Sequence, residues 1–390
     1  MSSARRTVVF AWGFVALLSA GLLVSLLRAT PYPLDDHFLY QSFIEALAGG
    51  KLDLTIQGFH GSDFFAVPWH LISKSATSQI EFQLFAALLI PLSAFLAGKT
   101  LYRSNADAIF LTCVLAMMPF VLFVGLRGWT GSAYMCLMLL SIACARRIPI
   151  MAGILIAFAI LTKPFAIALL PLLLVLNPSK KKRLLLFAVG IPVLYVALQY
   201  LQVGQVLVGA HSGYDQLSVW QEPQRIFLNL AHSLQILFSV HNYYFVDPAL
   251  TGPGNLMHTT PLLIFLGLFG LFGKGTSDQS SSIKKVLLFG AIIGIGLNAA
   301  LDHMDHFYMQ AGILCLIIAA IPLLKKYPLW IPIVIATLHF QWFYFFLQYG
   351  DLFQLDISFF LVPTIIDLIA VLYIVLNPKK LWVSFAELCK

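Results

Sequence analysis

Long runs of apolar residues decide what this chain of 390 residues can fold into. A membrane-spanning helix needs roughly 20 consecutive apolar residues. Runs close to that length recur along the chain, at 7–27, 82–98, 106–126, 130–145, 184–201, 259–273, 286–301, 308–324, 328–347 and 359–376. Hydrophobic residues make up 60% of the chain and charged residues 11%, against about 45–50% and about 25% in soluble domains. The sequence therefore predicts an all-α polytopic membrane protein.

The stretch 150–176 differs from the other apolar runs because "LTKPF" interrupts its middle. Basic residues flank it on both sides, at Arg146-Arg147 and in the run 180–183. Loops rich in Lys and Arg tend to stay in the cytoplasm, so both flanks are predicted on the inner side. The stretch must then enter the membrane and return as two short helices, with Lys163-Pro164 at the tip. About twelve membrane segments result, in a single integral membrane domain covering 1–390.

The distribution of charge predicts the orientation. Of the 24 basic residues, 18 lie in the proposed inner segments and six in the outer ones. This pattern predicts a multi-pass protein of the cell membrane with both termini in the cytoplasm. Two long outer loops follow, at 28–80 and 202–258, each expected to carry a short interfacial helix. Because topology explains the net charge of +7, nucleic acid is excluded as a partner, and membrane lipids are the expected surroundings.

The first outer loop opens with two adjacent carboxylates, Asp35 and Asp36, in "TPYPLDDHFLYQSFIEALAGGKLDL". From Leu39 to Leu47 an apolar residue recurs every four positions, as on one face of a helix, and Gly49-Gly50 then ends that helix. One interpretation is that the aspartates only cap the helix. A cap needs one acceptor, however, so two carboxylates at a membrane boundary favour a functional site.

The features after the first span come in a distinctive order. The acidic pair and its helix are followed by "GFHGSDFFAVPWHLIS", in which "FFAVPWHL" suggests a return to the membrane, and later by "LTKPF". In this order the chain resembles the GT-C superfamily of membrane glycosyltransferases, which includes protein mannosyltransferases and lipid A aminoarabinose transferases. The resemblance covers about residues 7–178, with a fainter echo at 306–324.

The chain also departs from the GT-C pattern. "RGWTGSAY" has no carboxylate where many relatives carry a second acidic residue, at the outer start of the fourth span. His306 and Gln310 stand where relatives often have Arg and Pro. The sugar class therefore does not follow from the resemblance.

The resemblance implies a GT-C-like fold and an inverting transfer on the outer face of the membrane. The donor would be a polyprenyl-phosphate sugar, and the acceptor an unidentified hydroxyl of a lipid, glycan or protein. Asp35 and Asp36 are the catalytic candidates: one would take the proton from the acceptor hydroxyl. We favour Asp35 as the base, with Asp36 capping or orienting, although the sequence does not distinguish the two.

A leaving lipid phosphate needs positive charge or hydrogen-bond donors. The candidates at the outer face are Lys163, Arg127, Lys74 and His306, with Arg225 as a further cation. Each arm of the 150–176 hairpin has only about 13 residues, or roughly 20 Å, so Lys163 is expected below the outer interface. The alternative is that Lys163 extends to the lipid headgroups without contacting substrate.

Histidines and an aspartate of the outer segments complete the predicted site. His60, Asp63, His70 and His303 are candidates for the substrate cavity. The cluster 302–306, "DHMDH", has a spacing that would also suit a divalent metal, or a solvated connector between spans. No cofactor is firmly implied, and a divalent metal stays an alternative.

Two other classes of function compete with the enzyme. A twelve-span secondary transporter would show repeats and polar groups deep within its spans. The sequence shows no internal repeat, and Lys163-Pro164 and Asp367 are its transporter-like features. A flippase for lipid-linked sugars, or a non-catalytic scaffold, is the third interpretation. Sugar transfer that depends on the aspartates would separate the enzyme from these alternatives.

Overall fold

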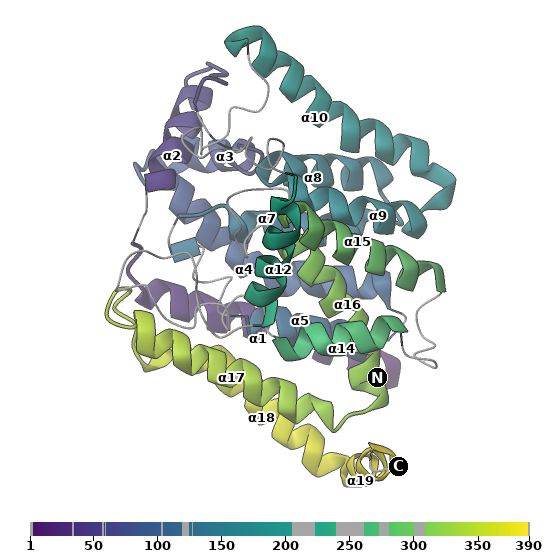
Figure 1. Ribbon diagram of the computed structural model, residues 1–390. Coiled ribbons are helices and arrows are strands. Elements are labelled where there is room, and N and C mark those ends of the chain that lie inside the picture. Colours follow the sequence, from purple (N-terminus) through teal and green to yellow (C-terminus); the bar gives the residue numbers. More distant parts are fainter. Residues whose placement is uncertain are drawn as a thin grey trace.

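The computed structural model describes residues 3–32, 35–56, 58, 60–102, 104–118, 125–126, 128–204, 223–238, 261–272, 281–299 and 309–388. Within these residues every regular element is a helix, which confirms the predicted all-α class for this part of the chain. Figure 1 shows the helices as a tilted bundle, with the two chain ends on the same side.

The helices follow the apolar runs closely. Their bounds are α1 Ser3–Arg28, α2 Asp35–Ala48, α3 Asp63–Ser73, α4 Ser78–Leu101, α5 Asn105–Ala116, α7 Gly131–Cys144, α8 Pro149–Thr162, η1 Pro164–Leu169, α9 Leu170–Leu176, η2 Pro178–Lys180, α10 Lys181–Val203, α12 Arg225–Phe238, α14 Pro261–Phe272, α15 Ser281–Ala299, α16 Gln310–Lys326, α17 Trp330–Tyr349, η4 Ile357–Phe360, α18 Leu361–Leu376 and α19 Pro378–Leu388.

Among the described helices, five are long and apolar enough to cross a membrane. They are Val9–Arg28, Ser78–Leu101, Pro178–Val203, Trp330–Leu347 and Ile357–Leu376, and each coincides with a predicted span. Several other apolar runs form shorter helices: α5 has 12 residues, or about 18 Å at 1.5 Å per residue, against a hydrocarbon core of ~30 Å. The architecture is consistent with an α-helical membrane protein, while the number twelve stays a prediction.

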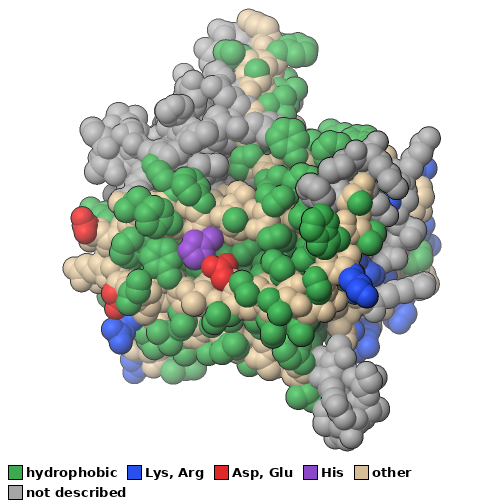
Figure 2. Space-filling model, turned by 90° about the horizontal axis from the view of Figure 1, so that it is seen from below, with side chains coloured by type: hydrophobic (Ala, Val, Ile, Leu, Met, Phe, Trp, Pro, Cys, Tyr) green, Lys and Arg blue, Asp and Glu red, His purple; other side chains and the backbone are tan. Residues whose placement is uncertain are grey.

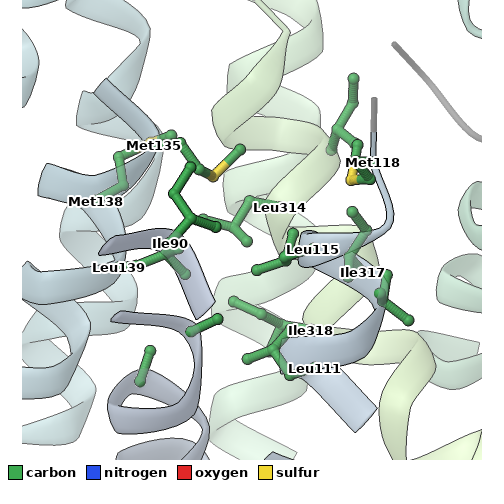
Figure 3. Close-up of a cluster of buried hydrophobic side chains, with 14 of the residues drawn as sticks. Ile90, Leu111, Leu115, Met118, Met135, Met138, Leu139, Leu314, Ile317 and Ile318 are labelled. Atoms are coloured by element: carbon green, nitrogen blue, oxygen red, sulfur yellow. The ribbon is translucent and has the colours of Figure 1, made fainter. Parts of the chain in front are cut away.

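The interior of the bundle is built around α16. A helix that is apolar on every side is stable only when other helices surround it, and every residue from Gln310 to Leu324 is buried. Figure 3 shows aliphatic and methionine side chains of α4, α5, α7 and α16 in contact, among them Ile90, Leu111, Leu115, Met118, Met135, Met138, Leu139, Leu314, Ile317 and Ile318.

The interrupted stretch 150–176 forms the predicted hairpin. Lys163 leaves helical geometry with φ −148° and ψ 117°, and the next residue, Pro164, starts η1. The side-chain amide of Asn177, after α9, donates to the backbone oxygens of Ala145 at 2.9 Å and Arg146 at 3.1 Å. These bonds hold the end of the second arm beside the start of the first, so the two basic flanks lie together.

Helices α17 and α18 lie along one edge of the bundle, next to α1 (Figure 1). Large aromatics are buried on their inner side, among them Trp342 of α17 and Phe359 of η4, just before α18. The hydroxyl of Ser25 in α1 donates to the Ser358 oxygen at 3.1 Å and fixes the start of α18. Their outer sides face away from the bundle, as in Figure 2, where hydrophobic side chains dominate the surface.

The described part of the second outer loop is α12 and the residues beside it. Asn229 of α12 donates to the Ala299 oxygen of α15 at 3.2 Å, and Ser233 is buried. Phe227 and Leu228, in contrast, are 77% and 57% exposed. The polar side of α12 therefore faces the protein and its apolar side faces outward, an arrangement suited to lipid. Most of 202–258 lies outside the described residues.

Candidate functional site

Helix α2 begins at Asp35 and ends at Ala48, before the predicted Gly49-Gly50 stop. Gly50 has φ +83°, a conformation that glycine adopts without strain. The apolar stripe of α2 lies against protein, because Phe43 and Ile44 are fully buried. The prediction of a helix is confirmed, whereas its place on the outer membrane surface stays a prediction.

The polar side of α2 holds the helix to the first turn of α4. The side-chain oxygen of Gln41 accepts from the Ser78 hydroxyl and from the Gln79 backbone N–H, both at 3.1 Å. His37 Nδ1 lies 2.9 Å from Gln79 Oε1. The amide nitrogen of Gln79 donates to the Gly128 oxygen at 2.8 Å, so its oxygen is the acceptor for His37. The His37 ring therefore carries a proton on Nδ1.

A second segment, 125–130, meets the start of α2. The Tyr32 N–H donates to the Leu126 oxygen at 2.9 Å. Gly128 has φ +73°, and a Cβ there would lie 3.2 Å from the His37 Cβ. Residues just before and just after the acidic pair thus contact residues on either side of position 127. The side chains of Asp35 and Asp36, and Arg127 as a whole, lie outside the described residues.

His60 and Asp63 form a closed pair beneath α2. Both side chains are 0% exposed, and His60 Nδ1 lies 2.9 Å from Asp63 Oδ2. His60 Nε2 lies 3.2 Å from the Ile56 backbone oxygen, to which it must donate because a carbonyl can only accept. The His60 ring stacks on Phe43, with ring centres 4.0 Å apart. Burial raises the pKa of the Asp63 carboxyl, and the hydrogen bond from His60 opposes that rise. One proton is therefore held between Nδ1 and the carboxyl.

Gly61 seats this pair on the 150–176 hairpin. Its N–H donates to the Leu161 oxygen at 3.1 Å. A Cβ at Gly61 would lie 2.1 Å from the Phe158 oxygen and 2.5 Å from the Thr162 nitrogen, so no other residue fits this approach. The half-buried Lys163 follows directly. The structure thus places Lys163 beside the first outer loop, whereas its contact with a phosphate stays a prediction.

The predicted site residues divide into two groups along α2. The acidic pair lies at its start, and Phe43, which touches His60, lies eight residues on, about 12 Å along the axis. His60 and Asp63 are closed off from substrate in this structure, so a cavity role stays a prediction. His70 Nδ1 lies 2.9 Å from the Ser78 hydroxyl, and the exposed Lys74 caps α3 with φ 51°.

Two predicted residues, His303 and His306, lie outside the described residues, as does the cluster 302–306. The described residues hold no group of three His, Cys, Asp or Glu side chains that could bind a metal ion. Sequence reasoning did not single out His37, Gln41 or Gln79. The available signal was a pair of polar residues, Ser78-Gln79, opening an apolar span, where unpaired polar groups would be costly.

The second outer loop reaches the first at Gln202. Its side-chain oxygen accepts from the Leu54 N–H, and its amide donates to the Leu52 oxygen, both at 3.0 Å. These bonds hold the last turn of α10 to the first outer loop. Comparison of the chain with protein-family models, curated proteins and solved structures gives no match.

Proposed function

We propose that the chain is a membrane glycosyltransferase that moves a sugar from a polyprenyl-phosphate donor to an acceptor hydroxyl. The observation that carries this proposal is the meeting of the start of α2 with segment 125–130. Residues on both sides of Asp35-Asp36 contact residues on both sides of position 127. Consecutive Cα atoms are about 3.8 Å apart, so two carboxylates and one guanidinium belong to neighbouring stretches of backbone.

This juxtaposition supplies the two kinds of group that the transfer needs. A carboxylate takes the proton of the acceptor hydroxyl while its oxygen bonds to the anomeric carbon of the sugar. The bond from that carbon to the phosphate oxygen breaks, and the electron pair leaves with the lipid phosphate. Arg127 is proposed to stabilise the charge on the departing phosphate. The N-terminal dipole of α2 favours the ionised carboxylate by about 0.3–1 kcal/mol.

The proposed topology places this reaction at the outer surface. About twelve segments would cross or enter the membrane, with both termini in the cytoplasm and the start of α2 on the outer side. Two hydrogen bonds hold the acidic end at the boundary of a long apolar helix: Gln41 accepts from the Gln79 N–H of α4, and His37 bonds the Gln79 side-chain oxygen. A lipid-linked donor presents its sugar phosphate at that depth, so membrane lipid and water would both reach the site.

The decisive experiment uses purified protein and radiolabelled polyprenyl-phosphate sugars with a mixture of candidate acceptors. Asp35→Asn and Asp36→Asn are tested separately, because Asn still caps a helix and so separates catalysis from capping. Asp53→Asn is the matched control: it is a carboxylate of the same outer loop, paired with Lys51 at 2.6 Å. We expect at least about a 100-fold loss of transfer in one of the first two variants, the usual size of general-base help.

Lys163 is tested in the same assay. If it contacts the donor phosphate, Lys163→Ala raises the apparent KM for the donor, and Lys163→Arg restores part of the loss because the charge is kept. Full activity in both Asn variants, with the Asp53→Asn control also active, would instead assign the double aspartate a capping role and remove the main support for the enzyme.

The helix break at Lys163 is the observation that keeps a transporter, or a flippase for lipid-linked sugars, as the second candidate, since transporters use interrupted helices. Asp367, the other transporter-like residue, argues against it, because it lies on the outer side of the bundle rather than on a path through it. Uptake or lipid flipping by a variant lacking both Asp35 and Asp36 carboxylates would favour this alternative.

A further inference from the structure

A histidine and an aspartate lie side by side on the outward face of α17 and α18. His339 Nδ1 is 2.7 Å from Asp367 Oδ2, with the side chains 40% and 36% exposed. This nitrogen is itself buried and forms no hydrogen bond among the described residues, so its contact with the carboxyl is a close polar approach on a partly exposed face. In Figure 2 a His and an acidic side chain sit together within the hydrophobic surface of this face.

The pair lies in the middle of the helices. His339 is nine residues from the start of α17 and ten from its end, about 14 Å from each at 1.5 Å per residue. The surrounding outward side chains are apolar: Phe340, Leu368 and Val371 are 53%, 66% and 58% exposed. Both helices are apolar and long enough to cross a membrane. The pair therefore falls at the depth where lipid chains offer no hydrogen bonds.

Ionisable side chains at this depth are costly, and they usually face a bundle interior or a partner. Here the bundle interior is on the other side of the two helices, where Trp342 of α17 and Ile366 of α18 are buried. The cost of placing these ionisable side chains in lipid therefore falls on the outward face of α17 and α18, which no other part of the described chain covers. A partner with complementary polar groups at the same depth would remove that cost.

The geometry points to a second copy of this chain as the partner. A twofold axis along the membrane normal leaves the depth of each residue unchanged. It reverses the left-to-right order of the two helices in the facing copy. It therefore sets α17 of one copy against α18 of the other. Because His339 and Asp367 share one depth on neighbouring helices, each copy presents a base opposite the other copy's acid, and two equivalent contacts form. We propose that this face is the interface of a membrane dimer.

The shape of the face fits a helix-on-helix contact. A groove of about 600 Å³ lies between α17 and α18, with His339 and Asp367 in its lining. Ala336 and Ala370 also line it, and small side chains let helices approach closely in membranes. Phe343 and Val371 border the same groove and would pack between the copies.

The test measures energy transfer between fluorescently labelled copies in phosphatidylcholine liposomes, as the protein is diluted with lipid. Wild type should associate. His339→Asp alone and Asp367→His alone should each associate about tenfold more weakly, the effect of losing two contacts of about 0.6 kcal/mol each. Thr364→Val is the matched control, since the hydroxyl of this exposed α18 residue donates to the Phe360 oxygen just before the helix, within the same copy.

Mixing the two single variants distinguishes a contact between copies from a contact within one copy. The His339→Asp copy has two acids on this face and the Asp367→His copy has two bases. The mixture should therefore associate as wild type does, although each variant alone does not. Val371→Trp, on an exposed position, should weaken association without changing the unfolding temperature.

Several outcomes would overturn the proposal. The proposal fails if wild type stays monomeric at every lipid dilution, or if the mixture associates no better than its components. Unchanged association in Val371→Trp would place the contact elsewhere. Stoichiometric purification of a different membrane protein, released by Asp367→His, would show that the face binds another partner rather than a second copy.

Discussion

Two His–Asp pairs of the described residues have nearly the same spacing and opposite surroundings. His60 and Asp63 lie 2.9 Å apart with no exposed side-chain surface. His339 and Asp367 lie 2.7 Å apart with more than a third of each side chain exposed. The first pair sits in the outer loop between α2 and the 150–176 hairpin, and the second on the outward face of α17 and α18.

The difference shows that the role of a His–Asp pair depends more on the groups around it than on the distance between its two members. Every polar group of the first pair is satisfied inside the protein: Ile56 accepts from His60, and the Ser62 hydroxyl lies 3.3 Å from Asp63 Oδ1. That pair stabilises one loop conformation. The second pair makes a close contact without a hydrogen bond at His339 Nδ1, and its side chains are partly exposed on an apolar face, as expected of an interface.

Breaking the buried His60–Asp63 pair, the inner pair, should have the largest effect on the free energy of unfolding. His60→Ala removes the partner of a fully buried carboxyl, and losing one member of a buried pair typically costs about 3–5 kcal/mol. The measurement is the free energy of unfolding in detergent, with His70→Ala as the control, since His70 is only half-buried and bonds one hydroxyl. Equal effects of the two variants would mean that the inner pair contributes no special stability.

Adding a side-chain carbon at Gly61 should have the next largest effect on the free energy of unfolding. In Gly61→Ala the new Cβ would meet backbone atoms of Phe158 and Thr162, which cannot move as a side chain can. Overpacking of this kind typically costs about 1–3 kcal/mol. Gly190→Ala, in α10 with nothing within 4 Å of the added carbon, should be neutral or stabilising. Limited proteolysis of the first outer loop would report whether the loop has left the hairpin.

The pH dependence of stability should distinguish Asp63 from an exposed carboxylate. Burial raises the pKa of Asp63 above its ordinary value of 3.8, so between that value and the folded pKa the native state binds more protons than the unfolded state. Stability must then fall as pH rises through this window, by at most about 1.4 kcal/mol per pH unit. Asp63→Asn should flatten this slope.

Asp53 gives the opposite sign and serves as the reference. Hydrogen bonds from Lys51 and Thr55 lower its pKa to about 2, so its contribution is present above the ordinary value of 3.8 and is lost as pH falls toward 2. Unfolding temperatures of wild type, Asp63→Asn and Asp53→Asn across this range would check both signs. A slope unchanged by Asp63→Asn would contradict the raised pKa.

The sequence predicted the elements better than their partners. Apolar runs and the Lys163-Pro164 interruption were sufficient for α4, α10 and the hairpin, because hydrophobic length and helix breaking are local properties. The seating of Gly61 on Leu161 joins residues 100 positions apart, and no local pattern encodes it. The same limit applies to His60 and Asp63: their place in the first outer loop suggested a cavity role, but no local pattern indicated their burial or the stacking of His60 on Phe43.

The smallest expected effect completes the comparison of the two pairs. In the isolated monomer, Asp367→Asn should change the free energy of unfolding by only about 0.6 kcal/mol, the average for a polar contact between membrane helices. The reason is that the outward pair is partly exposed and forms no hydrogen bond at His339 Nδ1, so little is lost when the charge is removed. The measurement is unfolding in a detergent that keeps the protein monomeric, alongside Asp63→Asn. A loss of unfolding free energy close to that of His60→Ala would mean that the His339–Asp367 pair stabilises the fold as the His60–Asp63 pair does. A small cost, in contrast, would leave the position of an acid in the middle of an apolar helix unexplained by folding, and would favour the proposed contact with a second copy.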